Sequence, residues 1–302
     1  MDEILIESSG DYYMDVREFQ SGAVEVVVKA IRPMHEGSIR SVADPLSYSN
    51  ACKALGESSS TSTTVRFKSE PEEVSEWDKL ANHRRAVRRA KQNIRWCVMQ
   101  MRADRLFTVT YRENVEDRER VKGGVKRFIR LVRKGWGEEG GIPDWRYVAV
   151  LEKQDRGAYH VHFAVKGWQR VSYLRKCWAK AIGGTGLERG ADTLGNVDVT
   201  SPRKARWGTE LMQWRCSKLA AYLVKYLSKT FDEKTFDKRR YWHSKDLKVP
   251  VRQRFMLCAV DMVTAIREAM DVIFSRFGHA IDFSRSWVAA SGDLLWLTLG
   301  ET

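Results

Sequence analysis

Apolar and polar residues alternate in several short stretches of the chain, and a period of two is typical of strands that have one buried face. β-branched and aromatic residues are frequent in these stretches, as strands favour. The predicted strands are 20–32, 105–111, 145–152, 158–166 and 196–200.

Between the strands, apolar residues recur every three or four positions, which is the period of an amphipathic helix. The clearest case is 115–134, where five apolar residues share one face: Val121, Val125, Phe128, Ile129 and Val132. Further helices are predicted over 70–102, 171–181, 213–229 and 252–278.

The central elements follow one another in the order β-α-β-β-α-β-α, with a glycine-rich loop over 183–195. This order predicts an α+β fold: a four- to five-stranded antiparallel sheet, RRM-like or ferredoxin-like, with helices on one face and the other face open. We divide the chain into an acidic N-terminal region with a partly flexible linker (1–80), a central domain (81–250) and a C-terminal helical extension (251–302).

The charge of the 302-residue chain is positive and unevenly distributed, with a formal net charge of +13. Residues 1–78 hold 15 acidic and 7 basic side chains, whereas residues 79–302 hold 24 acidic and 45 basic ones. A basic unit of this size favours a polyanionic partner such as nucleic acid.

The composition disfavours several classes of protein. No run of 18 or more apolar residues occurs, so no membrane span is expected. The N-terminus lacks the basic and apolar regions of a signal peptide. Five scattered cysteines form no CxxC pair, which argues against a zinc knuckle or a disulfide framework and favours a reducing cytoplasm.

A row of basic residues lies within the predicted helix 70–102. Six side chains recur at helical spacing and share one broad face: Arg84, Arg85, Arg88, Arg89, Lys91 and Arg95. Such a row is either a solvated helix face or a phosphate-binding surface. Few acidic residues lie nearby, so we interpret these six residues as candidate contacts to nucleic acid.

Two histidines, His160 and His162, stand in a strand pattern. Residues i and i+2 of a strand point to the same side of a sheet, so both imidazoles are presented together. A turn at 153–157 brings Glu152, at the end of the preceding strand, beside them. The pair is either two partly exposed histidines or a metal site. Two imidazoles and a carboxylate suit Mn²⁺ or Mg²⁺ and leave positions open for phosphate oxygens.

Two tyrosines, Tyr222 and Tyr226, lie four residues apart in the predicted helix 213–229, so they share a face. Paired tyrosines on an amphipathic helix often serve only as packing at the edge of a core. A tyrosyl oxygen can also attack a phosphate, if a metal or an ammonium group helps it to ionise. Lys225 and Lys229 follow on the same helix and could supply that charge.

With these motifs the chain resembles the HUH endonucleases that initiate rolling-circle replication in small plasmids and single-stranded-DNA phages. Residues 106–114 (LFTVTYREN) are similar to the first family motif, 160–162 (HVH) to the HUH signature, and 222–229 (YLVKYLSK) to the two-tyrosine motif with its trailing lysine. Glu152 is similar to the acidic metal ligand of several such initiators, and 240–245 (RYWHSK) to the aromatic, basic stretch that often follows.

The resemblance covers about 85–245 and implies an endonuclease domain over 81–250. It implies a metal-dependent nick at a replication origin that leaves a 5′-phosphotyrosine and a free 3′-hydroxyl, followed by rejoining. The implied catalytic residues are Tyr222, Tyr226, Lys225 and Lys229. The implied partners are origin DNA, as duplex and as single strand, and a host helicase, polymerase and single-strand-binding protein.

Other functions fit parts of the pattern. A two-tyrosine transposase or a plasmid relaxase would use the same chemistry, although such transposases usually carry a cysteine cluster that this chain lacks. A DNA-binding repressor or an RNA-binding module with an RRM-like sheet would need no catalysis. A nicking assay with and without Mn²⁺ separates the enzymes from the binding proteins.

Overall fold

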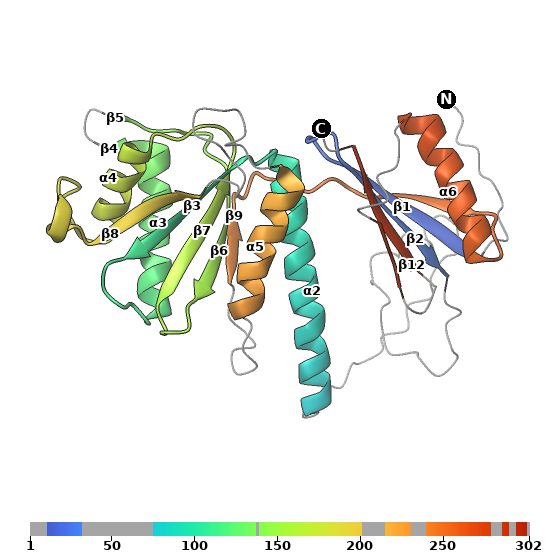
Figure 1. Cartoon of the computed structure of the whole chain (residues 1–302), viewed down its shortest axis with the longest axis horizontal. Helices are drawn as coiled ribbons and strands as arrows, with labels where there is room; N and C mark the ends of the chain where they lie inside the picture. Colours follow the sequence, from blue (N-terminus) through green and yellow to red (C-terminus); the bar gives the residue numbers. More distant parts are fainter. Residues whose placement is uncertain are drawn as a thin grey trace, which may run out of the picture.

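The structure is a computed structural model that describes residues 11–31, 75–136, 139–200, 215–230, 240–278, 286–289 and 294–300. Within these residues the chain forms two five-stranded antiparallel sheets and five α-helices (Figure 1). The predicted α+β class is therefore confirmed. None of the described helices is both long and apolar enough to cross a membrane.

One sheet, the central sheet, has the strand order β8-β3-β7-β6-β9. Its strands are β3 (Arg105–Tyr111), β6 (Tyr147–Lys153), β7 (Tyr159–Val165), β8 (Gly195–Thr200) and β9 (Tyr241–His243). The first four match the predicted strands to within two residues at each end, whereas β9 was not predicted. Two short strands, β4 (Gly135–Trp136) and β5 (Glu139–Gly140), pair separately.

Helices α3 (Arg118–Lys134) and α4 (Val171–Ala181) cover one face of the central sheet. Helix α3 begins later than the predicted 115, because the Asp117 side chain caps it by accepting from the backbone N–H groups of Glu119 and Arg120. The predicted apolar face of α3 is confirmed, with Ile129 only partly buried. This face packs on aromatic residues of the sheet, where the rings of Phe107 and Phe163 stack at 5.0 Å.

Helices α2 (Glu76–Met101) and α5 (Cys216–Thr230) pack on the opposite face of the same sheet. There Leu219 and Leu223 of α5 are fully buried against Val148 and Val150 of β6. The expected open face is therefore corrected: the helices cover the β6–β7 half of it. The sequence pattern showed the apolar stripe of each helix but not which side of the sheet would bury it.

The second sheet, the terminal sheet, has the order β10-β1-β2-β12-β11. Its strands are β1 (Tyr12–Glu18), β2 (Val24–Ala30), β10 (Gln253–Leu257), β11 (Ser286–Val288) and β12 (Leu294–Leu299). Helix α6 (Met262–Phe277) covers one of its faces. Segments from the two ends of the chain thus share one sheet, which the division into separate N- and C-terminal regions did not anticipate.

The apolar run 252–278, predicted as helical, contains both a strand and a helix. Its first part is β10, which pairs with β1. Helix α6 begins after Asp261, whose side chain accepts a hydrogen bond from the backbone N–H of Thr264. The strand partner is more than 230 residues away in sequence, so a local pattern could not reveal it. The polar stretch 57–64, interpreted as a linker, lies outside the described residues.

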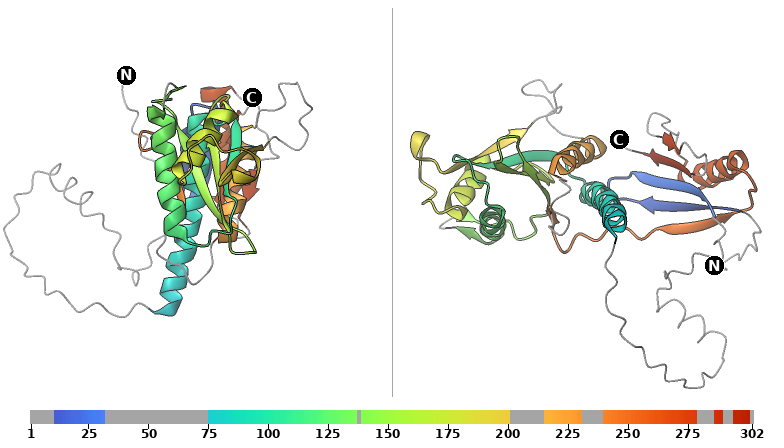
Figure 2. Two further views of the ribbon diagram at one scale, coloured as in Figure 1. Left: turned by 90° about the vertical axis from the view of Figure 1, so that its left-hand side faces the viewer. Right: turned by 90° about the horizontal axis from the view of Figure 1, so that it is seen from below.

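The helices α2 and α5 stand between the two sheets, and this placement is visible from two directions (Figures 1 and 2). The terminal sheet contacts α2 through Glu25, which is 2% exposed. One carboxylate oxygen of Glu25 accepts from Trp96 Nε1 at 2.9 Å, and the other accepts from Arg95 Nη2 at 3.2 Å. A buried acid paired in this way fixes α2 against the terminal sheet.

Candidate functional site

The pairing of β6 and β7 brings the three predicted metal ligands to one face. Glu152 lies directly opposite His160, and Val150 lies opposite His162. Directly opposed residues of an antiparallel pair point to the same side, and residues two apart on a strand do so as well. The face is the one on which α5 packs.

His162 is held from both sides of its ring. Its Nε2 lies 2.7 Å from Glu152 Oε2, and its Nδ1 lies 2.8 Å from Thr108 Oγ1 on the neighbouring β3. His162 and Glu152 are each 5% exposed. An ionised carboxylate only accepts, so in neutral His162 the Nε2–H donates to Glu152 and Nδ1 accepts from the Thr108 hydroxyl.

His160 is half-buried and has a different partner. Its Nδ1 lies 3.0 Å from Gln154 Nε2, while Gln154 Oε1 accepts from Arg156 Nε at 2.9 Å. The arginine fixes the orientation of the amide, so Gln154 donates to the imidazole. Burial lowers the pKa of His160, and the neighbouring His162 lowers it further. His160 therefore favours the neutral form, which is the form that binds metals.

The two tyrosines of α5 lie on this histidine face. The ring of Tyr226 stacks on His162 with 3.7 Å between centroids and 13° between planes. The Tyr226 hydroxyl donates to the Tyr222 hydroxyl at 2.6 Å. Burial and this hydrogen bond raise the pKa of Tyr226. The structure thus joins residues more than 60 positions apart in one contiguous group.

The two lysines of the two-tyrosine motif are on the same helix. Lys225 lies between the tyrosines in sequence and is exposed. Lys229 belongs to the last turn of α5, and its side chain lies outside the described ones. Their predicted part in the chemistry stays a prediction.

The donor set suits a divalent metal ion in type, with imidazole nitrogens and a carboxylate on one face. In the described part of the chain, however, no group of three or more His, Cys, Asp and Glu side chains is placed so that it could hold an ion. Glu152 and His162 are in direct contact, whereas the His160 ring is bonded to Gln154. Ligation by these three residues remains a prediction.

The basic residues of α2 do not all face solvent. Four of the six are exposed: Arg84, Arg85, Arg88 and Arg89. Lys91 is half-buried. Arg95 forms the ion pair with Glu25, and its guanidinium lies 4.3 Å above the ring of Trp296. The contact to the terminal sheet therefore gives Arg95 an intramolecular partner that the sequence pattern did not predict.

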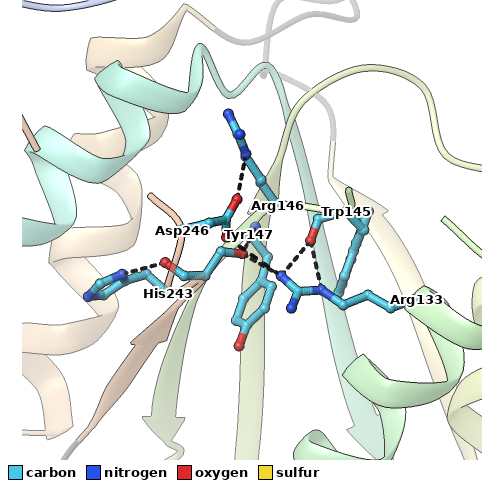
Figure 3. Close-up of polar contacts among 7 residues, drawn as sticks. Arg133, Trp145, Arg146, Tyr147, His243 and Asp246 are labelled. Atoms are coloured by element: carbon cyan, nitrogen blue, oxygen red, sulfur yellow. Dashed lines mark hydrogen bonds and ion pairs between the residues drawn. The ribbon is translucent and has the colours of Figure 1, made fainter. Parts of the chain in front are cut away.

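The stretch 240–245 forms the edge strand β9 and the turn after it, as Figure 3 shows. Ser244 Oγ accepts from Arg133 Nη2 and from the backbone N–H of Tyr147, both at 3.0 Å. Asp246 accepts from Arg146 Nε at 2.8 Å. These contacts bind the stretch to β6, so it supports the strand that carries Glu152.

Sequence reasoning missed Thr108 and Gln154 as neighbours of the histidines. The alternation in β3 already placed Thr108 on the face opposite to Phe107. Only the strand order, with β3 beside β7, shows that this face is the histidine face. Gln154 follows Glu152 by two residues, so its side of the sheet was readable from the same alternation.

Fold and site together define an α+β protein in which an antiparallel sheet presents two histidines and a glutamate to a pair of helical tyrosines. Residues 104–231 match a family model of replication-associated proteins, the family of ORF2 and the phage gene 2 protein. Over this segment the chain is similar to phage replication initiators of that family. The match runs from the start of β3 to the end of α5 and so includes every residue of the site. No curated protein and no solved structure matches the chain.

Proposed function

We propose that the protein is a rolling-circle replication initiator that nicks and rejoins one strand of DNA at an origin. The observation that carries this proposal is the contact of Tyr226 and Tyr222 with the His162–Glu152 pair. A merely structural tyrosine pair would not need a buried acid and two histidines beside its hydroxyl groups. The match to phage replication-associated proteins supports the same function.

In the nicking step, a tyrosine oxygen attacks the phosphorus of the scissile phosphodiester. The new bond joins the tyrosine oxygen to phosphorus, and the bond from phosphorus to the 3′ oxygen breaks. The tyrosine loses its proton, and the leaving 3′ oxygen takes one up. The products are a 5′-phosphotyrosine and a free 3′-hydroxyl, which primes synthesis.

The hydrogen bond between the tyrosines favours Tyr222 as the first nucleophile. Tyr226 donates and Tyr222 accepts, and a donated hydrogen bond stabilises negative charge on the accepting oxygen. Once Tyr222 holds the 5′ end, Tyr226 is one helical turn away and can cut the regenerated origin. The 3′-hydroxyl freed by the second cut then attacks the first phosphotyrosine and closes the circle.

Glu152, His160 and His162 would hold a Mn²⁺ or Mg²⁺ ion that, when bound, polarises the scissile phosphate and stabilises charge in the transition state. Thr108 would hold the ring of His162 in its ligating orientation. Lys225 and Lys229 would bind phosphate. The exposed arginines of α2 would bind the origin duplex. A host helicase, polymerase and single-strand-binding protein complete the proposed partners.

The test is a nicking assay on origin DNA, supercoiled and as a single-stranded oligonucleotide, with Mn²⁺ and with excess chelator. We expect nicking with Mn²⁺ only, loss of nicking in His160→Ala, and duplex binding by that variant close to wild type. The matched control is His243→Ala, a half-buried histidine of β9 outside the site. Nicking by His160→Ala, or nicking that persists in chelator, contradicts the proposal. Duplex binding without any nicking favours the repressor instead.

A further inference from the structure

A cleft of about 330 Å³ lies between α5, the C-terminal half of α2 and β12. This volume is in the range of small-ligand sites, about 300–1,000 Å³. Its walls combine an apolar part with cations and hydroxyl groups. The residues concerned are Met99, Trp296, Arg95, Lys218, Ser217 and Thr298. The cleft is separate from the histidine face, because Lys218 and Ala221 line it from the solvent side of α5.

The charge of the cleft is positive. Among the described residues that line it none is acidic, while Arg95 and Lys218 contribute two cations. The nearby acid Glu25 is buried, and its two oxygens accept from Arg95 and Trp96. This pairing also holds the Arg95 guanidinium 4.3 Å above the ring of Trp296. An anionic ligand therefore meets preorganised positive charge next to an aromatic surface.

The aromatic surface continues beyond the cleft. Trp287 of β11 lies directly opposite Trp296 of β12, so both indoles point to the same face of the terminal sheet. Trp287 is 57% exposed. This is the face opposite to α6. Aromatic side chains beside cations are how proteins bind single strands without reading sequence, because bases stack on the rings and phosphates meet the cations.

The position of the cleft relates it to the tyrosines. Lys218 precedes Tyr222 by four residues on α5, a distance of about 6 Å along the helix axis. Lys225 lies two turns beyond Lys218 on the same exposed face. A strand bound in the cleft can therefore pass along the lysines of α5 to the tyrosine pair.

We infer that this cleft binds unpaired nucleotides of single-stranded DNA, with bases on Trp296 and Trp287 and phosphates on Lys218 and Arg95. The inference rests on the proposed function only in naming this strand as the one that is cleaved. The binding itself is a separate property of the terminal sheet and α5.

The test measures binding of a fluorescent oligothymidylate to the full chain by anisotropy, in excess chelator. Trp287→Ala should weaken binding about 5- to 100-fold, since one stacked base accounts for that range. Trp287→Phe should restore most of the affinity. Lys218→Glu should weaken binding and reduce its salt dependence. Both positions are exposed, so folding is preserved. Trp168→Ala is the matched control, because this exposed tryptophan lies on the other sheet unit.

Wild-type affinity in both Trp287→Ala and Lys218→Glu overturns the inference. So does equal competition by a blunt duplex, because a duplex offers phosphates but no unstacked bases. The doubly substituted chain with Tyr222→Phe and Tyr226→Phe should bind oligothymidylate normally yet not cleave. Failure of the cleft thus leaves cleavage at saturating DNA unchanged, whereas failure of the proposed function leaves single-strand binding unchanged.

Discussion

At the scale of single residues, the centre of the site is the imidazole of His162. It touches a carboxylate, a hydroxyl and an aromatic ring, contributed by β6, β3 and α5. Each contact restrains the ring in a different direction, so its orientation is fixed before any ligand binds. Preorganised groups of this kind lower the cost of reaching the productive geometry.

Thr108→Val removes the hydroxyl partner of His162 Nδ1 and keeps the shape of the side chain. We expect nicking to require a higher Mn²⁺ concentration and its rate to fall about 10- to 100-fold, as is typical when a partner of a metal-binding histidine is lost. The measurement is the nicking rate across a Mn²⁺ titration. Thr110→Val, one strand pair further along β3, is the control. An unchanged Mn²⁺ dependence in Thr108→Val would show that this hydroxyl does not orient the histidine.

The residue pairs at the site were partly readable from sequence. The alternation in 158–166 placed His160 and His162 together, and the turn at 153–157 placed Glu152 beside them; the strand register agrees with both predictions. The stacking of Tyr226 on His162 could not be read, because it depends on where α5 crosses the sheet. Nor could the ion pair of Arg95 be read, since Glu25 belongs to a strand 70 residues earlier.

At the scale of elements, helix α2 has two different surfaces. Its C-terminal half is buried between α5 and the two sheets, with Ile94, Cys97 and Val98 fully enclosed. Its N-terminal half carries the exposed arginines and extends beyond α5 (Figure 1). A helix anchored at one end and basic at the other is suited to reach the phosphates of a duplex.

Charge reversal of the exposed half, Arg84→Glu with Arg88→Glu, should weaken duplex binding and flatten its salt dependence. Each lost phosphate contact should reduce the slope of log affinity against log salt by about 0.9. The measurement is duplex affinity at several salt concentrations. The control is Arg130→Glu with Lys126→Glu on α3, on the opposite side of the central sheet. An unchanged slope in the α2 variant would mean that this row is only a solvated helix face.

At the scale of the whole molecule, the two ends of the chain build one sheet that docks on the helix pair. The strand pattern of 20–32 predicted β2 correctly in place and type, but its neighbours β1 and β12 pair with it from opposite ends of the sequence. Local periodicity reports which residues are buried, and it carries no information on partners so distant. The terminal sheet was therefore the largest feature that sequence reasoning did not foresee.

The docking depends on Glu25, so Glu25→Ala should loosen the terminal sheet from α2. The loss leaves Arg95 and Trp96 Nε1 without their acceptor. We expect the free energy of unfolding to fall by less than the about 3–5 kcal/mol typical of a broken buried pair, because the Arg95 side chain is 30% exposed. Denaturant unfolding measures this loss. Glu18→Ala, which breaks the exposed pair with Arg276, should cost about 0–1 kcal/mol. Equal losses in the two variants would refute a special role of Glu25.

The central claim is that the tyrosines of α5 attack DNA. Mass spectrometry of the covalent adduct formed with a single-stranded origin oligonucleotide tests it most directly. The account predicts a 5′-phosphotyrosine at Tyr222 in the wild type, some adduct in Tyr222→Phe and in Tyr226→Phe, and none in the double variant, with Tyr159→Phe behaving as wild type. An adduct at any other residue, or an undiminished adduct in the double variant, would contradict the account.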